Sequence, residues 1–204
     1  MRAVAAVLVV LATACGGSDS AGPAAPSGSP STTTTVDNSG TVEYVGDERP
    51  ARLVIPPSWD PAGDPMPLVV LLHGYGASGD LQDVYLGVSA TGADLGYLAL
   101  TPNGTTDTRG NRFWNASNRG GLVDDTGYII ALIDDVIAGF NADPNQVYLL
   151  GHSNGGFMAN RIACELPDRV AGIVAIAGGL FGESSNCAGP MRMVFVQGTA
   201  DATV

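Results

Sequence analysis

The strongest indication of the fold is QVYLLGHSNGGFMANRIACELPD, residues 146–168. An apolar run ends at His152 and a helical pattern begins after Ser153, so the segment predicts a strand, a sharp turn and a helix. Gly151 and Gly155 give the pattern G-x-S-x-G around the serine. In a turn that raises a nucleophile above a sheet, these two positions must be small. The pattern alone is weak in a chain with 28 glycines, so the strand–turn–helix context supports the interpretation.

Apolar runs like the one before Ser153 recur along the chain and predict further strands. They cover residues 41–45, 51–56, 67–74, 97–104, 146–152, 171–179 and 191–198. Helical patterns lie between them, at 124–140, with Asp124 or Asp125 as N-cap, and at 154–165, ending before a proline. The alternation predicts an α/β fold with a mostly parallel sheet and helices on both faces. Ligands bind such sheets beyond the carboxyl ends of the strands.

Composition supports one soluble domain and excludes one large class of partner. The chain has 204 residues, of which 45% are apolar and 14% charged, which is enough apolar surface for a single hydrophobic core. The formal net charge is −11. Nucleic acid is therefore not expected as a partner, because no basic stripe is present to neutralise phosphates.

The first 40 residues differ in character from the rest. Residues 1–15, MRAVAAVLVVLATAC, predict a signal peptide, since the apolar run is too short to span a bilayer. Its end resembles a bacterial lipobox, which predicts lipidation of Cys15 and a membrane anchor; plain secretion after Ala14 is the alternative. Residues 16–40 are rich in Pro, Gly, Ser and Thr and predict a flexible linker. The domain then covers 41–204. We expect a bacterial cell-surface lipoprotein or a secreted, extracellular protein.

A serine nucleophile needs donors for the negative charge that develops in the reaction. The backbone N–H of Asn154, at the start of the helix, is one candidate. The loop HGYG at residues 73–76 follows an earlier strand, and the Tyr75 N–H is the second candidate. An ordinary turn at the end of a strand is the alternative for this loop. Two backbone donors on either side of Ser153 would form an oxyanion hole.

The serine also needs a base, and the base needs an orienting acid. Asp201 follows the strand at 191–198, where the acid belongs in the chain order serine, acid, histidine. The only histidines are His73, in the oxyanion loop, and His152, next to the serine, and neither is expected to reach Ser153. We therefore interpret the chain as a C-terminally truncated domain, with an incomplete sheet and the catalytic histidine lacking. These 204 residues are expected to be inactive as they stand.

Several segments together resemble the extracellular poly(3-hydroxybutyrate) depolymerase and feruloyl-esterase type of α/β-hydrolase, whose members include lipoproteins. The matching segments are LLHGYG at 71–76, TPNG at 101–104, RFWNAS at 112–117, VDDTGYIIALIDDV at 123–136, the long run at 143–179 and GTAD at 198–201. The resemblance implies an α/β-hydrolase fold and hydrolysis of carboxylic esters through an acyl-enzyme. Ser153 and Asp201 would be catalytic, and Tyr75 and Asn154 would form the oxyanion hole.

The resemblance also implies a place for Trp114 near the substrate, with simple packing as the alternative. It implies a disulfide in the region of Cys164 and Cys187, an even pair that an exported protein can oxidise. Neither a metal nor another cofactor is expected. The ester substrate could be a polymer, an oligomer or an aromatic ester. Two other functions remain open. One is a non-catalytic envelope lipoprotein that binds a ligand on the same fold, and the other is an acyltransferase.

Overall fold

The computed structural model describes residues 40–117 and 122–204. The predicted signal peptide at 1–15, with Cys15, and nearly all of the predicted linker at 16–40 lie outside the described residues. The main sheet contains β1 (Thr41–Val45), β2 (Ala51–Ile55), β3 (Met66–Leu72), β4 (Leu98–Thr101), β7 (Ala142–His152), β8 (Gly172–Ile176) and β9 (Met193–Val196). β5 (Thr105–Thr106) and β6 (Arg112–Phe113) form a small antiparallel pair.

The strands of the main sheet lie in the order β1-β2-β4-β3-β7-β8-β9. β4, β3, β7, β8 and β9 are parallel, and β1 and β2 are antiparallel additions at one edge. The mostly parallel sheet predicted from the sequence is therefore confirmed. His152, Ile176 and Val196 stand in one row at the carboxyl ends of β7, β8 and β9. The loops and turns after these three residues therefore begin at the same edge of the sheet.

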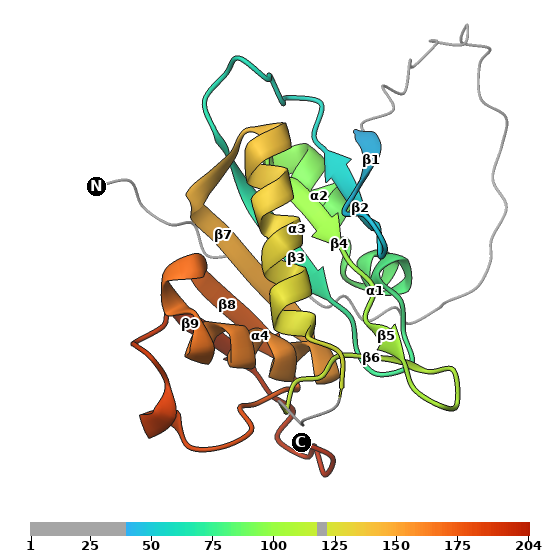
Figure 1. Cartoon of the computed structure of the whole chain (residues 1–204), viewed down its shortest axis with the longest axis vertical. Coiled ribbons are helices and arrows are strands. Elements are labelled where there is room, and N and C mark those ends of the chain that lie inside the picture. The colour runs from blue at the N-terminus through green and yellow to red at the C-terminus, as the bar shows by residue number, and fades with distance from the viewer. Residues whose placement is uncertain (1–39, 118–121) are drawn as a thin grey trace, which may run out of the picture. The chain divides into compact units, whose positions relative to one another are not determined.

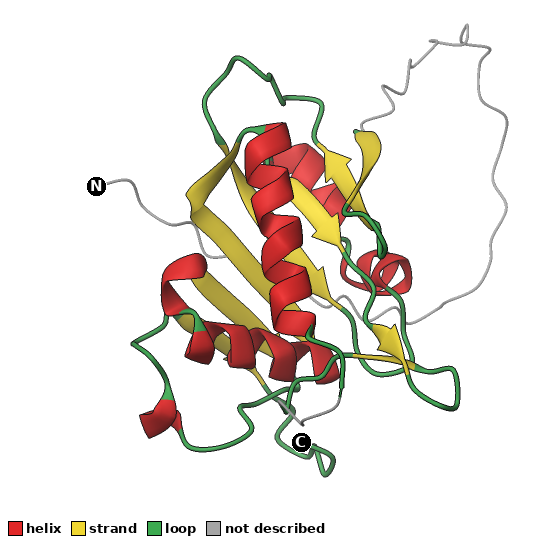
Figure 2. Cartoon of the chain, viewed as in Figure 1, coloured by secondary structure: helices red, strands yellow, loops and turns green. Residues whose placement is uncertain are grey.

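Helices cover both faces of this sheet, as Figures 1 and 2 show. They are α1 (Gly79–Leu86), α2 (Val88–Leu95), α3 (Asp125–Phe140) and α4 (Asn154–Glu165), with short 3-10 turns at η1 (Pro167–Arg169) and η2 (Ser184–Asn186). In Figure 1, α3 and α4 lie across the near face of the sheet, and α2 lies behind it. The arrangement has three layers, with the sheet between two layers of helices.

The continuous apolar run of β3 is explained by this double cover. Leu68, Val70 and Leu72 belong to the larger core cluster, which contains the buried apolar side chains of α3 and α4. Leu71 belongs instead to the smaller cluster with Val88 of α2. Successive side chains of a strand point to opposite faces, so a strand covered on both sides must be apolar at every position.

The two long helices begin and end as their sequences predict. Asp124 caps α3, and its side chain accepts a hydrogen bond from the Gly127 N–H. α4 begins at Asn154, directly after the serine, and ends at Glu165, before Pro167. α1 and α2 were not predicted. They are short, and they end at Gly87 and Gly96 in left-handed conformations.

Candidate active site

Ser153 occupies a strained turn between β7 and α4. Its backbone has φ 50° and ψ −119°, a conformation that residues with a Cβ rarely adopt and that often marks functional sites. The Ser153 N–H donates to the Ile176 carbonyl at 2.8 Å, which ties the turn to β8. The side chain is partly exposed and makes no capping hydrogen bond to α4. The hydroxyl thus stands at the carboxyl edge of the sheet.

Two glycines allow this turn because α4 lies directly against the sheet. A Cβ at Gly155 would overlap the Leu72 carbonyl oxygen and approach the His73 oxygen to 2.7 Å. A Cβ at Gly151 would come within 2.6 Å of the Gly156 nitrogen. All of these neighbours are backbone atoms, which cannot rotate away. The small residues of the G-x-S-x-G pattern are therefore a packing requirement of this turn.

A pocket of about 360 Å³ opens beside the serine. Its lining includes Ser153, Tyr75, Leu81, Gln82 and Tyr85. The rings of Tyr75 and Tyr85 and the side chain of Leu81 are all exposed. The pocket thus offers mainly apolar walls next to the Ser153 hydroxyl, which suits a small or elongated apolar ligand.

The HGYG loop lies close to the serine. A Cβ at Gly74 would lie 3.5 Å from the Ser153 Cβ. Among the described residues, the backbone N–H groups of Tyr75 and Asn154 donate no hydrogen bond to the protein. Asn154 is also the first residue of α4, where the helix dipole favours negative charge. Two backbone N–H groups, one in the HGYG loop and one directly after Ser153, thus have no acceptor among the described residues.

The Tyr75 side chain is held by the hairpin of β5 and β6. Its hydroxyl donates to the Asp107 carboxylate at 2.5 Å and accepts from Asn111 Nδ2 at 3.0 Å. The hydrogen bond from Tyr75 lowers the pKa of Asp107, and the same bond raises the pKa of Tyr75. The hydrogen bond is therefore fully formed at a pH between the ordinary pKa values of an aspartate and a tyrosine. It is lost at lower pH, when Asp107 is protonated, and at higher pH, when Tyr75 is ionised.

Neither histidine is placed to act as a base for Ser153. His73 is fully buried, its Nε2 accepts from the Gly104 N–H at 2.9 Å, and its Nδ1 lies 2.8 Å from the Gly74 oxygen. This pairing requires the neutral ring with the proton on Nδ1. Burial is the main cause that lowers the pKa of His73. His152 Nδ1 lies 3.2 Å from Gln82 Oε1.

Asp201 follows β9 at the same edge of the sheet as Ser153. Its carboxylate accepts from the backbone N–H of Thr203 at 2.9 Å and of Val204 at 3.2 Å, and from Gln197 Nε2 at 3.3 Å. β8 lies between β7 and β9, so the strands that carry the serine and the aspartate are about 10 Å apart. A separation of this size leaves room for one intervening side chain.

Trp114 follows β6 and is only 1% exposed. The side chain is packed in the interior, and Trp114 also borders a pocket of about 250 Å³ together with Asn154. Its place near the substrate stays a prediction. The Trp114 indole Nε1–H donates to the His73 carbonyl at 3.0 Å. The Trp114 backbone pairs with the side chain of Asn154, because its N–H donates to Asn154 Oδ1 at 2.6 Å and its oxygen accepts from Asn154 Nδ2 at 3.1 Å.

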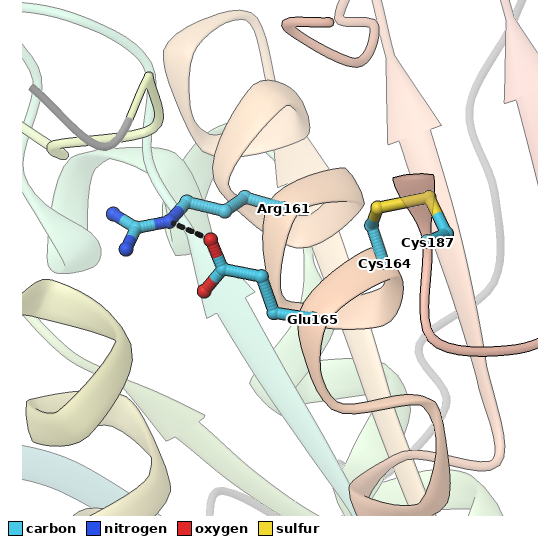
Figure 3. The surroundings of a disulfide bond; sticks show 4 residues. All are labelled: Arg161, Cys164, Glu165 and Cys187. Atoms are coloured by element: carbon cyan, nitrogen blue, oxygen red, sulfur yellow. Dashed lines mark hydrogen bonds and ion pairs between the residues drawn. A yellow bond between two sulfur atoms is a disulfide. The ribbon is translucent and has the colours of Figure 1, made fainter. Parts of the chain in front are cut away.

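Cys164 and Cys187 form a disulfide between α4 and the segment before β9 (Figure 3). Arg161, one turn earlier on α4, pairs with Glu165 at 2.9 Å. The guanidinium of Arg161 also donates to the Asn115 carbonyl at 2.5 Å. The disulfide thus connects the helix that begins beside Ser153 with the segment that leads into β9, the strand before Asp201.

Sequence reasoning missed Gln82, a buried polar residue of α1. Its Oε1 accepts from the Gly74 N–H at 3.1 Å and lies close to His152 Nδ1. Gln82 therefore holds the HGYG loop through a hydrogen bond to its backbone. The available signal was Ser78, which caps α1, with Gly87 at its end. Without a prediction of α1, nothing distinguished Gln82 from a surface glutamine.

Neither a metal cluster nor a membrane-spanning helix occurs in the described residues, 40–117 and 122–204. No group of three or more His, Cys, Asp or Glu residues in these ranges could hold a metal ion. No helix in the same ranges has the length and apolar character needed to cross a bilayer.

Comparisons with known proteins identify the family of this chain. Residues 51–203 match the family model described as Esterase PHB depolymerase. A protein named as an esterase, NocK of Nocardia uniformis subsp. tsuyamanensis, is 30% identical over 171 residues, which cover 78% of this chain and 47% of NocK. Poly(3-hydroxyalkanoate) depolymerase C of Paucimonas lemoignei is 31% identical over 140 residues, 66% of this chain and 33% of the depolymerase.

Among solved structures, the acetyl xylan esterase from Aspergillus awamori superposes with a TM-score of 0.55 at 20% identity. The match covers 67% of this chain and 51% of the esterase. This likeness confirms the α/β-hydrolase fold, of which the described residues form a part. The chain spans about a third to a half of the length of the three proteins compared.

Proposed function

Because this chain belongs to the Esterase PHB depolymerase family, we propose that it carries the nucleophile, the acid and the oxyanion hole of a serine carboxylic-ester hydrolase. The observation that supports this most directly is the strained backbone of Ser153, at φ 50°, between β7 and α4. Such strain persists only where the surrounding structure enforces it. Here it places a hydroxyl beside a pocket and two unused backbone donors.

The proposed reaction proceeds through an acyl-enzyme. The Ser153 oxygen attacks the ester carbonyl carbon while its proton passes to a base. The negative charge that forms on the carbonyl oxygen is stabilised by the N–H groups of Tyr75 and Asn154. The intermediate then breaks its bond to the alcohol oxygen, which takes the proton back from the base. Water attacks the acyl-enzyme in the same way and releases the carboxylic acid product, and the base returns a proton to the Ser153 oxygen.

The base is the part of this mechanism that the chain does not supply. Both ring nitrogens of His73 have partners, and His152 points to Gln82. We propose that a histidine from outside these 204 residues enters between Ser153 and Asp201. The Nδ1–H of this histidine would donate to the Asp201 carboxylate, in place of the groups that donate to it now. The 204 residues alone would then show no esterase turnover.

The pocket beside Ser153 supports esters with apolar groups as substrates. Tyr75, Leu81 and Tyr85 provide its exposed walls. Aromatic esters and oligomers or polymers of hydroxyacids both have this character, so both belong to the proposal. We further propose export, with residues 1–15 as signal peptide, a lipid on Cys15 and a linker at 16–40. Mass spectrometry of the mature N-terminus tests this: a diacylglyceryl group on Cys15 supports the anchor, and cleavage after Ala14 supports plain secretion.

A fluorophosphonate probe and p-nitrophenyl acetate test the serine mechanism. The protein at its natural length is compared with Ser153→Ala and with Ser185→Ala, a matched change at an exposed serine of η2. We expect labelling and turnover in the unaltered protein and in Ser185→Ala, and neither in Ser153→Ala. A natural-length protein that is folded but neither labelled nor active would refute the enzyme and favour a non-catalytic binding module on this fold.

A further inference from the structure

Trp114 touches both sides of the proposed oxyanion hole. On one side, its buried indole lies against His73, with ring centroids 4.9 Å apart, and its Nε1–H donates to the His73 carbonyl. His73 begins the short loop that carries the Tyr75 N–H. On the other side, the backbone of Trp114 is paired with the side chain of Asn154 through two hydrogen bonds. Asn154 supplies the second N–H.

The contacts around Trp114 leave it little freedom to move. A Cβ at Gly104 would lie 3.3 Å from Trp114 Cδ2, so the backbone of Gly104 lies close to the indole. The Gly104 N–H donates in turn to His73 Nε2. Trp114 and Gly104 come from separate strand ends and both bond to His73 in the buried interior, where hydrogen bonds are strong.

We infer that Trp114 is a positioning residue that fixes the separation of the Tyr75 and Asn154 N–H groups. The inference rests on the proposed function, because it assigns a role within that oxyanion hole. The Asn154 N–H is set by the start of α4, whereas the Tyr75 N–H lies on a loop. An oxyanion must meet both donors at hydrogen-bonding distance at once. Trp114 connects the two, because its indole holds the loop at His73 and its backbone holds the Asn154 side chain at the start of the helix.

The residue types at these two positions agree with this role. Asparagine has one acceptor and two donor hydrogens on a short side chain, so it can pair with both backbone groups of Trp114. Aspartate would lack the donor, and alanine would keep only the backbone N–H. Phenylalanine at 114 would fill most of the indole's space but could not donate to the His73 carbonyl.

Trp114→Phe tests the inference, with Trp59→Phe as the matched control. Trp59 also donates its Nε1–H to a backbone carbonyl, that of Phe140 at 2.8 Å. Phe140 is the last residue of α3. Both variants lose one indole bond. We expect kcat of the natural-length protein for p-nitrophenyl acetate to fall at least about tenfold in Trp114→Phe, with KM changed less than about twofold. Trp59→Phe should keep kcat within about twofold.

Asn154→Ala is a second variant, for the case that Trp114→Phe does not fold. It retains the backbone donor, removes the pairing with Trp114 and should lower kcat in the same way. Thermal unfolding of all variants checks the fold. Kcat values for Trp114→Phe and Asn154→Ala that match those of Trp59→Phe would overturn the inference while Ser153-dependent turnover stands. If the unaltered protein has no turnover that depends on Ser153, the proposed function fails and the inference fails with it.

Discussion

Gly155→Ala should destabilise the domain through a single methyl group. The new Cβ would overlap the Leu72 carbonyl oxygen and would lie 2.7 Å from the His73 oxygen. Ordinary contacts of a Cβ begin near 3.4 Å. The shortfall at His73 alone is 0.7 Å (3.4 minus 2.7), and it is larger at Leu72. The first turn of α4 must therefore move away from β3 by about 1 Å.

The magnitude depends on the atoms that resist this movement. Overpacking of a core costs about 1–3 kcal/mol, and the upper end applies here because the obstacles are backbone atoms of a central strand. About 3 kcal/mol corresponds to a fall in Tm of about 6–12 °C for a domain of this size. The Asn154 N–H moves with the helix, so turnover should fall by up to about 100-fold in the natural-length protein.

Gly139→Ala provides the matched control. Gly139 also lies in a helix, α3, and a Cβ there would have nothing within 4 Å. Its Tm should stay unchanged or rise slightly, since alanine favours a helix by up to about 1 kcal/mol. Differential scanning calorimetry of both variants measures the difference. A Tm for Gly155→Ala within about 2 °C of the unaltered protein would refute the proposed close packing of α4 on β3.

Three further predictions concern stability. Replacement of Cys164 and Cys187 by serine should lower the free energy of unfolding, measured in urea, by about 3 kcal/mol, because the disulfide no longer restricts the unfolded chain. Reduction of the disulfide in the unaltered protein should lower the free energy of unfolding by the same amount. Arg49→Met should cost about 3–5 kcal/mol because it removes the positive partner of the fully buried Asp125 carboxylate, which among the described residues keeps only its hydrogen bond from the Asn115 N–H. A concurrent Asp125→Asn should recover part of that loss in chemical unfolding. Burial lowers the pKa of His73, so the unfolded chain binds the proton first; the free energy of unfolding should fall as the pH drops below about 6.5, and His73→Gln should remove this dependence.

Much of the fold could be predicted because its elements have strong local signals. The runs at 67–74 and 146–152 are apolar at nearly every position, and the structure places β3 and β7 there. The stripe of α3 is equally clear. α1 and α2 could not be predicted in this way. The sequence of α2, VSATGADL, carries small and polar residues with no pronounced apolar face, so its helix depends on the sheet behind it.

The residues of the candidate site also fall into two groups, those that the sequence predicts and those that it does not. The sequence by itself determined the turn at Ser153 and the sheet edge at which Asp201 lies, because both depend on neighbouring residues and on the direction of parallel strands. The contacts of Trp114 and His73, by contrast, follow only from the packing of the whole domain. Trp114 and Asn154 are separated by 40 positions, and no local pattern encodes such a pairing. Their contact arises only when packing brings distant strand ends together, and burial then requires each polar group to find a partner.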